Sequence, residues 1–294
     1  MKLSLGLRAG LVSVLLLALV LGVWHLATQS STPAVPAAAA TLTPEQIEYA
    51  RLMGKDPGAS GAASPVQKAG FPTLGQMAAV VAKNLSDPFY DNGPNDKGIG
   101  VQLAYSLGRV GLGYLLAALV AIPVGFVIGL SPLLHRALDP FIQVLKPISP
   151  LAWMPLALYT IKDSAVSGVF VIFICSIWPM LLNTAFGVAS VRREWLNVAR
   201  TLEVSRLRTA FEVILPAAAP TILTGMRISM GIAWLVIVAA EMLVGGTGIG
   251  YFVWNEWNNL ALPSVIFAVV MIGLVGMLLD QAFGWLQKLV TYRE

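Results

Sequence analysis

The chain has 294 residues, of which 57% are hydrophobic and only 12% are charged, with a formal net charge of +4. A soluble domain carries about 25% charged residues, so the composition excludes an ordinary soluble globular protein. No basic stripe with interleaved aromatic residues accompanies the positive charge, which argues against a nucleic-acid partner. With one cysteine and two histidines far apart in the sequence, we expect no internal disulfide, no metal site and no catalytic centre.

Six apolar runs are long enough to cross a membrane as helices. In chain order they cover residues 11–27, 103–130, 141–161, 166–189, 222–244 and 265–290. The runs lack the alternation of apolar and polar residues that marks the strands of a membrane barrel. We therefore expect an all-α, polytopic membrane protein of about six transmembrane helices.

The first run follows Lys2 and Arg8, which is also the pattern of a secretory signal. Because its apolar stretch is long enough to span, we favour an uncleaved helix over a cleaved signal. The polar region after it is rich in Pro, Ala, Ser and Gly, which indicates a linker. We expect an N-terminal transmembrane helix at 1–29, a periplasmic linker segment at 30–102 and a five-helix core at 103–294.

Basic residues gather in alternate connections between the runs. Arg136 and Lys146 follow the second run, five arginines lie between the fourth and fifth, and Lys288 and Arg293 lie in the tail. Cytoplasmic loops of membrane proteins collect Lys and Arg. We therefore expect these connections and both termini to be cytoplasmic.

The longest of these basic connections, residues 191–220, is here called the Arg-rich loop. Its apolar residues recur at roughly helical spacing, which predicts one or two short amphipathic helices. Such a helix is either a plain surface helix or one that docks in a groove of another protein. Ala199 and Leu202 are three residues apart, so we expect them to share a face and enter such a groove together.

The Arg-rich loop resembles the EAA loop of binding-protein-dependent ABC importer permeases. That family's pattern is Glu-Ala-Ala, three residues, Gly, and then Ile-x-Leu-Pro about ten residues on. This chain keeps Ile214-Leu215-Pro216 but has Asn197 for Glu, Val198 for the first Ala and Glu203 for Gly. The resemblance implies contacts with an ATPase subunit through Asn197, Val198, Ala199, Arg200, Thr201, Leu202, Glu203 and Leu207.

The resemblance extends over residues 71–289. Residues 106–125, 146–155 and 240–251 resemble the nitrate, taurine and sulfonate branch, whereas residues 88–100 and 255–260 are similar to the cyanobacterial nitrate permease and its bicarbonate sister. It implies the type I ABC importer permease fold in a bacterial inner membrane. The substrate it implies is nitrate, accompanied by nitrite, with bicarbonate as the alternative.

The same resemblance implies an assembly. We expect a second permease copy, two cytoplasmic ATPase subunits that bind ATP and Mg, and an external solute-binding protein, with or without a lipid anchor. The chain has no Gly-x-x-x-x-Gly-Lys-[Ser/Thr] motif, so we expect it to carry no nucleotide and no cofactor of its own. It is expected to be a permease subunit and not an enzyme.

Three charged residues within the apolar runs are candidates for the anion pathway, because a charge in the bilayer normally faces the bundle interior, a partner or water. Arg109 suits a planar anion, since a guanidinium presents its donors as a flat fork. For Arg227 we favour snorkelling to the cytoplasmic surface. For Glu241 we favour a structural bond to backbone donors, with gating as the alternative.

Two other classes of protein were weighed. A secondary anion transporter would show an inverted repeat with coupling acids at the midplane, and neither is evident in the sequence. A membrane-embedded enzyme would need clustered His, Asp or Glu at the lipid boundary, and no such cluster is present.

Overall fold

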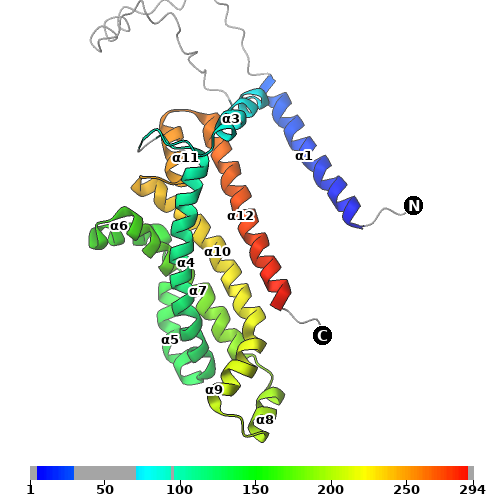
Figure 1. Ribbon diagram of the computed structural model, residues 1–294, viewed down its shortest axis with the longest axis vertical. Coiled ribbons are helices and arrows are strands. Elements are labelled where there is room, and N and C mark those ends of the chain that lie inside the picture. Colours follow the sequence, from blue (N-terminus) through cyan, green and yellow to red (C-terminus); the bar gives the residue numbers. More distant parts are fainter. Residues whose placement is uncertain (1–4, 30–70, 94–95, 291–294) are drawn as a thin grey trace, which may run out of the picture. The chain divides into compact units, whose positions relative to one another are not determined.

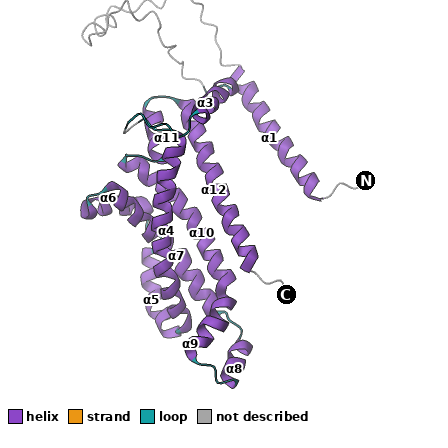
Figure 2. Cartoon of the chain, in the orientation of Figure 1, coloured by secondary structure: helices purple, strands orange, loops and turns teal. Residues whose placement is uncertain are grey.

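The computed structural model describes residues 5–29, 71–93 and 96–290. Within these ranges the chain is helical apart from its loops and one isolated antiparallel bridge between Asp91 and Lys97 (Figure 2). The chain divides into two units, residues 1–80 and 81–294. The expected linker character of residues 30–70 lies outside the described residues.

The first unit holds helix α1, Leu5–Gln29, and the start of helix α3, Leu74–Ser86. Residues 6–28 of α1 are long and apolar enough to cross a membrane, as predicted for the first run. Near the end of α1, the Trp24 indole donates a hydrogen bond to the Pro72 carbonyl at 2.8 Å and packs against the Phe71 ring. This contact ties the end of α1 to the residues just before α3.

Four long helices build the second unit: α4 (Ile99–Leu130), α7 (Ser164–Ala189), α10 (Leu215–Val244) and α12 (Leu262–Val290) (Figure 1). Helix α7 packs against both α4 and α10. A Cβ atom added at Gly125 or Gly129 of α4 would lie within 2.7 Å of a carbonyl oxygen of α7. Small residues at these positions let the two backbones approach, which is the usual basis of helix packing in membranes.

The predicted third membrane helix, residues 141–161, is wrong as a single straight helix. The structure has α5, Pro132–Leu145, and α6, Pro150–Ile161, bent by 89° from one another. Proline has no N–H to donate and disfavours helical backbone in the residue before it. Ser149, which precedes Pro150, is accordingly extended, with φ −58° and ψ 135°. The described residues thus contain five candidate spans, or six if the bent pair counts as one.

Two connections complete the second unit. The Arg-rich loop folds into α8 (Arg193–Thr201), α9 (Arg206–Thr209) and a π-helical turn, Ala210–Ile214, that leads into α10. The connection between α10 and α12 contains α11, Ile249–Asn258, which the sequence analysis did not predict. Figure 1 shows α8 and α9 at the opposite end of this unit from α11.

Candidate functional site

Helix α8 is held to the membrane helices by one side. Leu196 packs against a cluster of Val188, Ile214, Ala218 and Ile222 from α7, the π-helical turn and α10. Ala199 is only 4% exposed. The base of α8 is therefore part of the chain's own core, which fixes the helix relative to α7 and α10.

The other side of α8 carries a second set of apolar residues, which point away from the chain. Trp195, Val198 and Leu202 are 43%, 58% and 71% exposed, and their spacing of three and four residues places them on one helix face. We call these three residues the exposed stripe. Leu207 and Phe211 are also exposed beyond it. The prediction that Ala199 and Leu202 enter a groove together is wrong, because Ala199 is buried within the chain.

The end of α8 explains the glycine in the family's loop pattern. Glu203 has a φ of 54°, in the left-handed region. Its N–H donates to the Arg200 carbonyl and the Val204 N–H donates to the Ala199 carbonyl, both at 3.0 Å. These two bonds form a Schellman motif, whose left-handed residue is usually glycine. Glu203 occupies that position here, so it acts as the helix terminator. Asn197, Arg200 and Thr201 lie exposed on the preceding turns.

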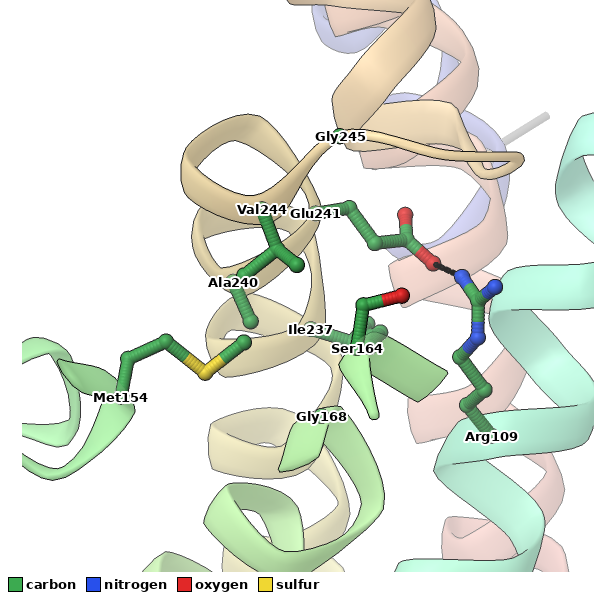
Figure 3. A pocket seen from close by; sticks show the side chains of 9 residues that line it. All are labelled: Arg109, Met154, Ser164, Gly168, Ile237, Ala240, Glu241, Val244 and Gly245. Atoms are coloured by element: carbon green, nitrogen blue, oxygen red, sulfur yellow. Dashed lines mark hydrogen bonds and ion pairs between the residues drawn. The ribbon is translucent and has the colours of Figure 1, made fainter. Parts of the chain in front are cut away.

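At the other end of the unit, Glu241 is surrounded by hydrogen-bond donors. Its carboxylate is 3% exposed and accepts from the Ser106 hydroxyl at 2.8–2.9 Å, the Arg109 guanidinium at 2.8 Å and the Gly250 N–H at 3.1 Å. Figure 3 shows the Arg109 side chain reaching from α4 to this carboxylate. The preferred interpretation of Glu241, a structural bond to backbone donors, agrees with the Gly250 bond.

The chain between α10 and α11 wraps closely around Glu241. Gly245 and Gly246 have φ values of 78° and 93°, which favour glycine. A Cβ on Gly248 would lie 2.2 Å from the Glu241 carboxyl carbon, and one on Gly250 would lie 2.1 Å from the Val238 carbonyl oxygen. Only glycine fits at these two positions. We call residues 245–248 the glycine turn.

Three polar side chains of helix α4 bond to the backbone of the glycine turn and of the residue that follows it. The Gln102 side chain accepts from the Gly248 N–H at 2.6 Å, and the Ser106 hydroxyl oxygen accepts from the Ile249 N–H at 2.9 Å. Arg109 donates to the Thr247 carbonyl at 2.6 Å. Sequence reasoning missed Gln102 and Ser106, although their spacing with Arg109 puts three polar residues on one face of an apolar helix.

A cavity of about 10 Å³ adjoins this site, lined by Arg109, Met154, Ser164 and Glu241 among others (Figure 3). That volume holds about one water molecule. A larger opening of about 550 Å³ lies between α4 and α7, and among the described residues that line it Arg109 is the only charged one. Nη1 of Arg109 donates to both Glu241 and Thr247, so the role that these contacts describe is to hold the turn. Contact with an anion stays a prediction.

The second ion pair joins α10 to α12. Arg227 donates from Nε and Nη2 to the two carboxylate oxygens of Asp280, at 2.6 and 2.5 Å. Snorkelling of Arg227 to the cytoplasmic surface stays a prediction. The structure adds this ion pair, whose partner sequence reasoning did not name because the two residues lie on different helices. The side chains of Arg227 and Asp280 are 39% and 55% exposed, in contrast to the buried Glu241.

Comparison with known proteins places this architecture in one family. Residues 121–292 match the model of the binding-protein-dependent transport system inner membrane component. The chain belongs to this family of transport permeases. It is thus a component of a transport system and not an enzyme, and its candidate spans make it a multi-pass protein of the inner membrane.

Individual relatives of the permease are named for three substrates. The nitrate import permease protein NrtB of Synechocystis sp. is 46% identical over 71% of this chain and 76% of its own length. The bicarbonate transport system permease protein CmpB of the same organism is also 46% identical, over 70% and 74%. The taurine transport system permease protein TauC of Escherichia coli is 35% identical over 64% and 69%.

Solved structures support the fold of the permease. A chain of the MetNI methionine ABC transporter in an inward facing conformation aligns with a TM-score of 0.57 at 13% identity, covering 64% of this chain and 94% of that one. An amino acid ABC transporter chain aligns with the same TM-score over 74% and 98%. The predicted all-α fold of an ABC importer permease is confirmed.

Proposed function

We propose that the chain is the permease subunit of an ATP-driven importer for nitrate, with nitrite as a second substrate. The observation that carries the proposal is the identity of 46–48% to proteins named nitrate import permease, each covering about 70% of this chain. Bicarbonate is the alternative, because a protein named for bicarbonate transport is equally similar at 46%. Identity alone does not choose between two small planar oxyanions.

The energy for uphill import comes from other subunits in this proposal. The chain has no P-loop motif, so force has to enter through a protein contact. The exposed stripe, together with Leu207, supplies an apolar surface on a helix that is fixed at its base by Leu196 and Ala199. Such a helix suits a groove on an ATPase subunit, with Arg200 and Asn197 at its polar edge.

Orientation and assembly belong to the same proposal. The distribution of Lys and Arg favours cytoplasmic termini and a cytoplasmic Arg-rich loop, with the glycine turn and α11 toward the periplasm. Two copies of the chain would pair with two ATPase subunits and receive the anion from an external binding protein. ATP and Mg would be held by the ATPase subunits.

The deciding experiment is uptake of labelled nitrate, nitrite and bicarbonate by the complex in proteoliposomes with its binding protein and internal ATP. We expect ATP-dependent nitrate uptake that unlabelled nitrite competes away. Uptake of bicarbonate without nitrate would select the alternative. Uptake of a sulfonate and of neither anion would refute both.

A further inference from the structure

The ion pair between Arg227 and Asp280 lies deep within the membrane-spanning helices. At about 1.5 Å per residue, Arg227 is about 18 Å from the start of α10 at Leu215, and Asp280 is about 15 Å from the end of α12 at Val290. The hydrocarbon core is about 30 Å thick. Both charges are thus more than two helical turns from the nearer end of their helix.

Asp280 does not lie on the face of α12 that carries its most exposed large apolar side chains. At 100° per residue, Asp280 shares its face with Gly273, Gly276, Gly284 and Gln287, whereas Leu278, Trp285 and Leu289 lie on the opposite face. Those three apolar side chains are 60%, 64% and 64% exposed. Because α12 has these apolar side chains for lipid, and a charge within the bilayer normally faces water or a polar partner, we infer that the open side of the half-exposed ion pair faces water or a polar surface.

One edge of the Arg227 guanidinium is left open. Asp280 engages Nε and Nη2, whereas Nη1 has no hydrogen-bond partner within the part of the chain that the structure describes. Gly284 of α12 leaves room beside this edge, since an added Cβ there would lie 3.6 Å from Nη1. A turn away, Gln287 donates to the Thr224 hydroxyl at 2.9 Å, which continues the polar seam between α10 and α12.

We propose that Arg227 is an oxyanion contact on the translocation pathway and that Asp280 sets how tightly it holds the anion. This inference rests on the proposed function. A planar oxyanion accepts two hydrogen bonds from the open guanidinium edge. The Asp280 carboxylate on the adjacent edge offsets most of the positive charge, so the anion binds weakly and leaves quickly. Weak binding is a requirement of any conducting path.

The first test asks whether water and anions reach the pair. In a Cys175→Ala background, which removes the chain's one native thiol, Met277→Cys and Leu278→Cys are compared in the assembled complex in proteoliposomes. The two residues are adjacent in depth, 48% and 60% exposed, and about 100° apart around α12. We expect an anionic methanethiosulfonate reagent to modify Met277→Cys at least tenfold faster. Equal rates would overturn the proposal.

The second test measures how far nitrate slows the modification of Met277→Cys by the same reagent, an effect here called protection. Asp280→Asn keeps a hydrogen-bonding side chain but removes the competing charge, so the half-protecting nitrate concentration should fall by about tenfold. Arg227→Gln should abolish protection, and the double variant should behave like Arg227→Gln. A purely structural pair would instead leave the half-protecting concentration unchanged while lowering the yield of complex, and that result would refute the proposal.

Failure of the inference is distinguishable from failure of the proposed function. Nitrate import by the complex with Met277→Cys tests the function, and the protection curves test the site. Import without any dependence of protection on Asp280 would refute only the site. Absence of nitrate import, with protection by bicarbonate in place of nitrate, would refute the nitrate assignment and retain the site for the alternative oxyanion.

Discussion

Helix α10 takes part in two ion pairs that differ in almost every physical respect. Near its end, Glu241 is buried and accepts hydrogen bonds from Ser106, Arg109 and Gly250. Midway along, Arg227 meets Asp280 across an open seam with more than a third of each side chain exposed. A buried charge is tolerated only where donors surround it. The first pair is therefore built to hold structure, whereas the second retains donors for something outside the chain.

The largest expected effect comes from breaking the buried pair. Glu241→Ala leaves the Arg109 guanidinium without its carboxylate and the Gly250 N–H without an acceptor, which costs on the order of 3–5 kcal/mol. We expect the yield of monodisperse complex, measured by size-exclusion chromatography after detergent extraction, to collapse. Arg227→Ala is the matched control on the same helix, and it should preserve most of the yield while impairing import. Equal losses for the two variants would remove the distinction between the pairs.

The two sides of α8 differ in a similar way, because one side packs within the chain and the other is exposed and available to a partner. Leu202→Asp puts a charge on the exposed stripe, where the free chain has no packing to lose. A buried, unpaired charge at a docking surface is costly, so we expect at least tenfold less ATPase subunit to co-purify with a normally folded permease. Ala199→Asp buries the charge inside the chain and should lower the melting temperature of the permease itself. A normal melting temperature for Ala199→Asp with lost association would restore Ala199 to the docking surface.

The sequence was informative where a property is local. Hydropathy located the long membrane helices, and the Arg-rich loop was expected to be helical because its apolar residues recur with a helical period. Hydropathy alone did not reveal the break between α5 and α6, so the run was predicted as one helix, although it contains Pro147 and Pro150. Helix α11 was not predicted because its polar residues, such as Asn255 and Glu256, interrupt the apolar pattern.

The contacts of the charged residues depended on folding. Ser106 and Glu241 are 135 residues apart in the chain, and no local pattern relates them. The same holds for Arg227 and Asp280, which are 53 residues apart. Burial of Ala199 also follows from tertiary packing, since helical spacing places it on the border between the inner face and the exposed stripe. The left-handed backbone at Glu203, in contrast, coincides with the family's glycine, a local signal that the sequence analysis noted without drawing the backbone conformation from it.

A smaller effect is expected at Glu203, the terminator of α8. Left-handed backbone costs a non-glycine residue roughly 1–2 kcal/mol, so Glu203→Gly should raise the melting temperature of the permease by a few degrees or leave it unchanged. ATPase association should persist, because the exposed stripe is untouched. Glu203→Val, which is branched at Cβ, is the contrasting variant and should lower the melting temperature. A lower melting temperature for Glu203→Gly would show that the Glu203 side chain itself stabilises the loop.

The smallest effect is expected at the pair of Asp91 and Lys97, in the loop before α4, where the Asp91 side chain is 52% exposed. The hydrogen bond from Lys97 holds the pKa of the Asp91 carboxyl below its usual range. Because this pKa is lowered by folding, its contribution to stability is present at neutral pH and is lost only as the pH falls through the lowered pKa. An ion pair whose carboxylate is exposed to solvent contributes little, and an Asn side chain still accepts from the Gly93 N–H, as Asp91 does. Asp91→Asn should therefore leave the melting temperature at pH 7 within a degree or so of the unmodified permease. A loss as large as that of Glu241→Ala would mean that burial of the carboxylate does not separate these two ion pairs.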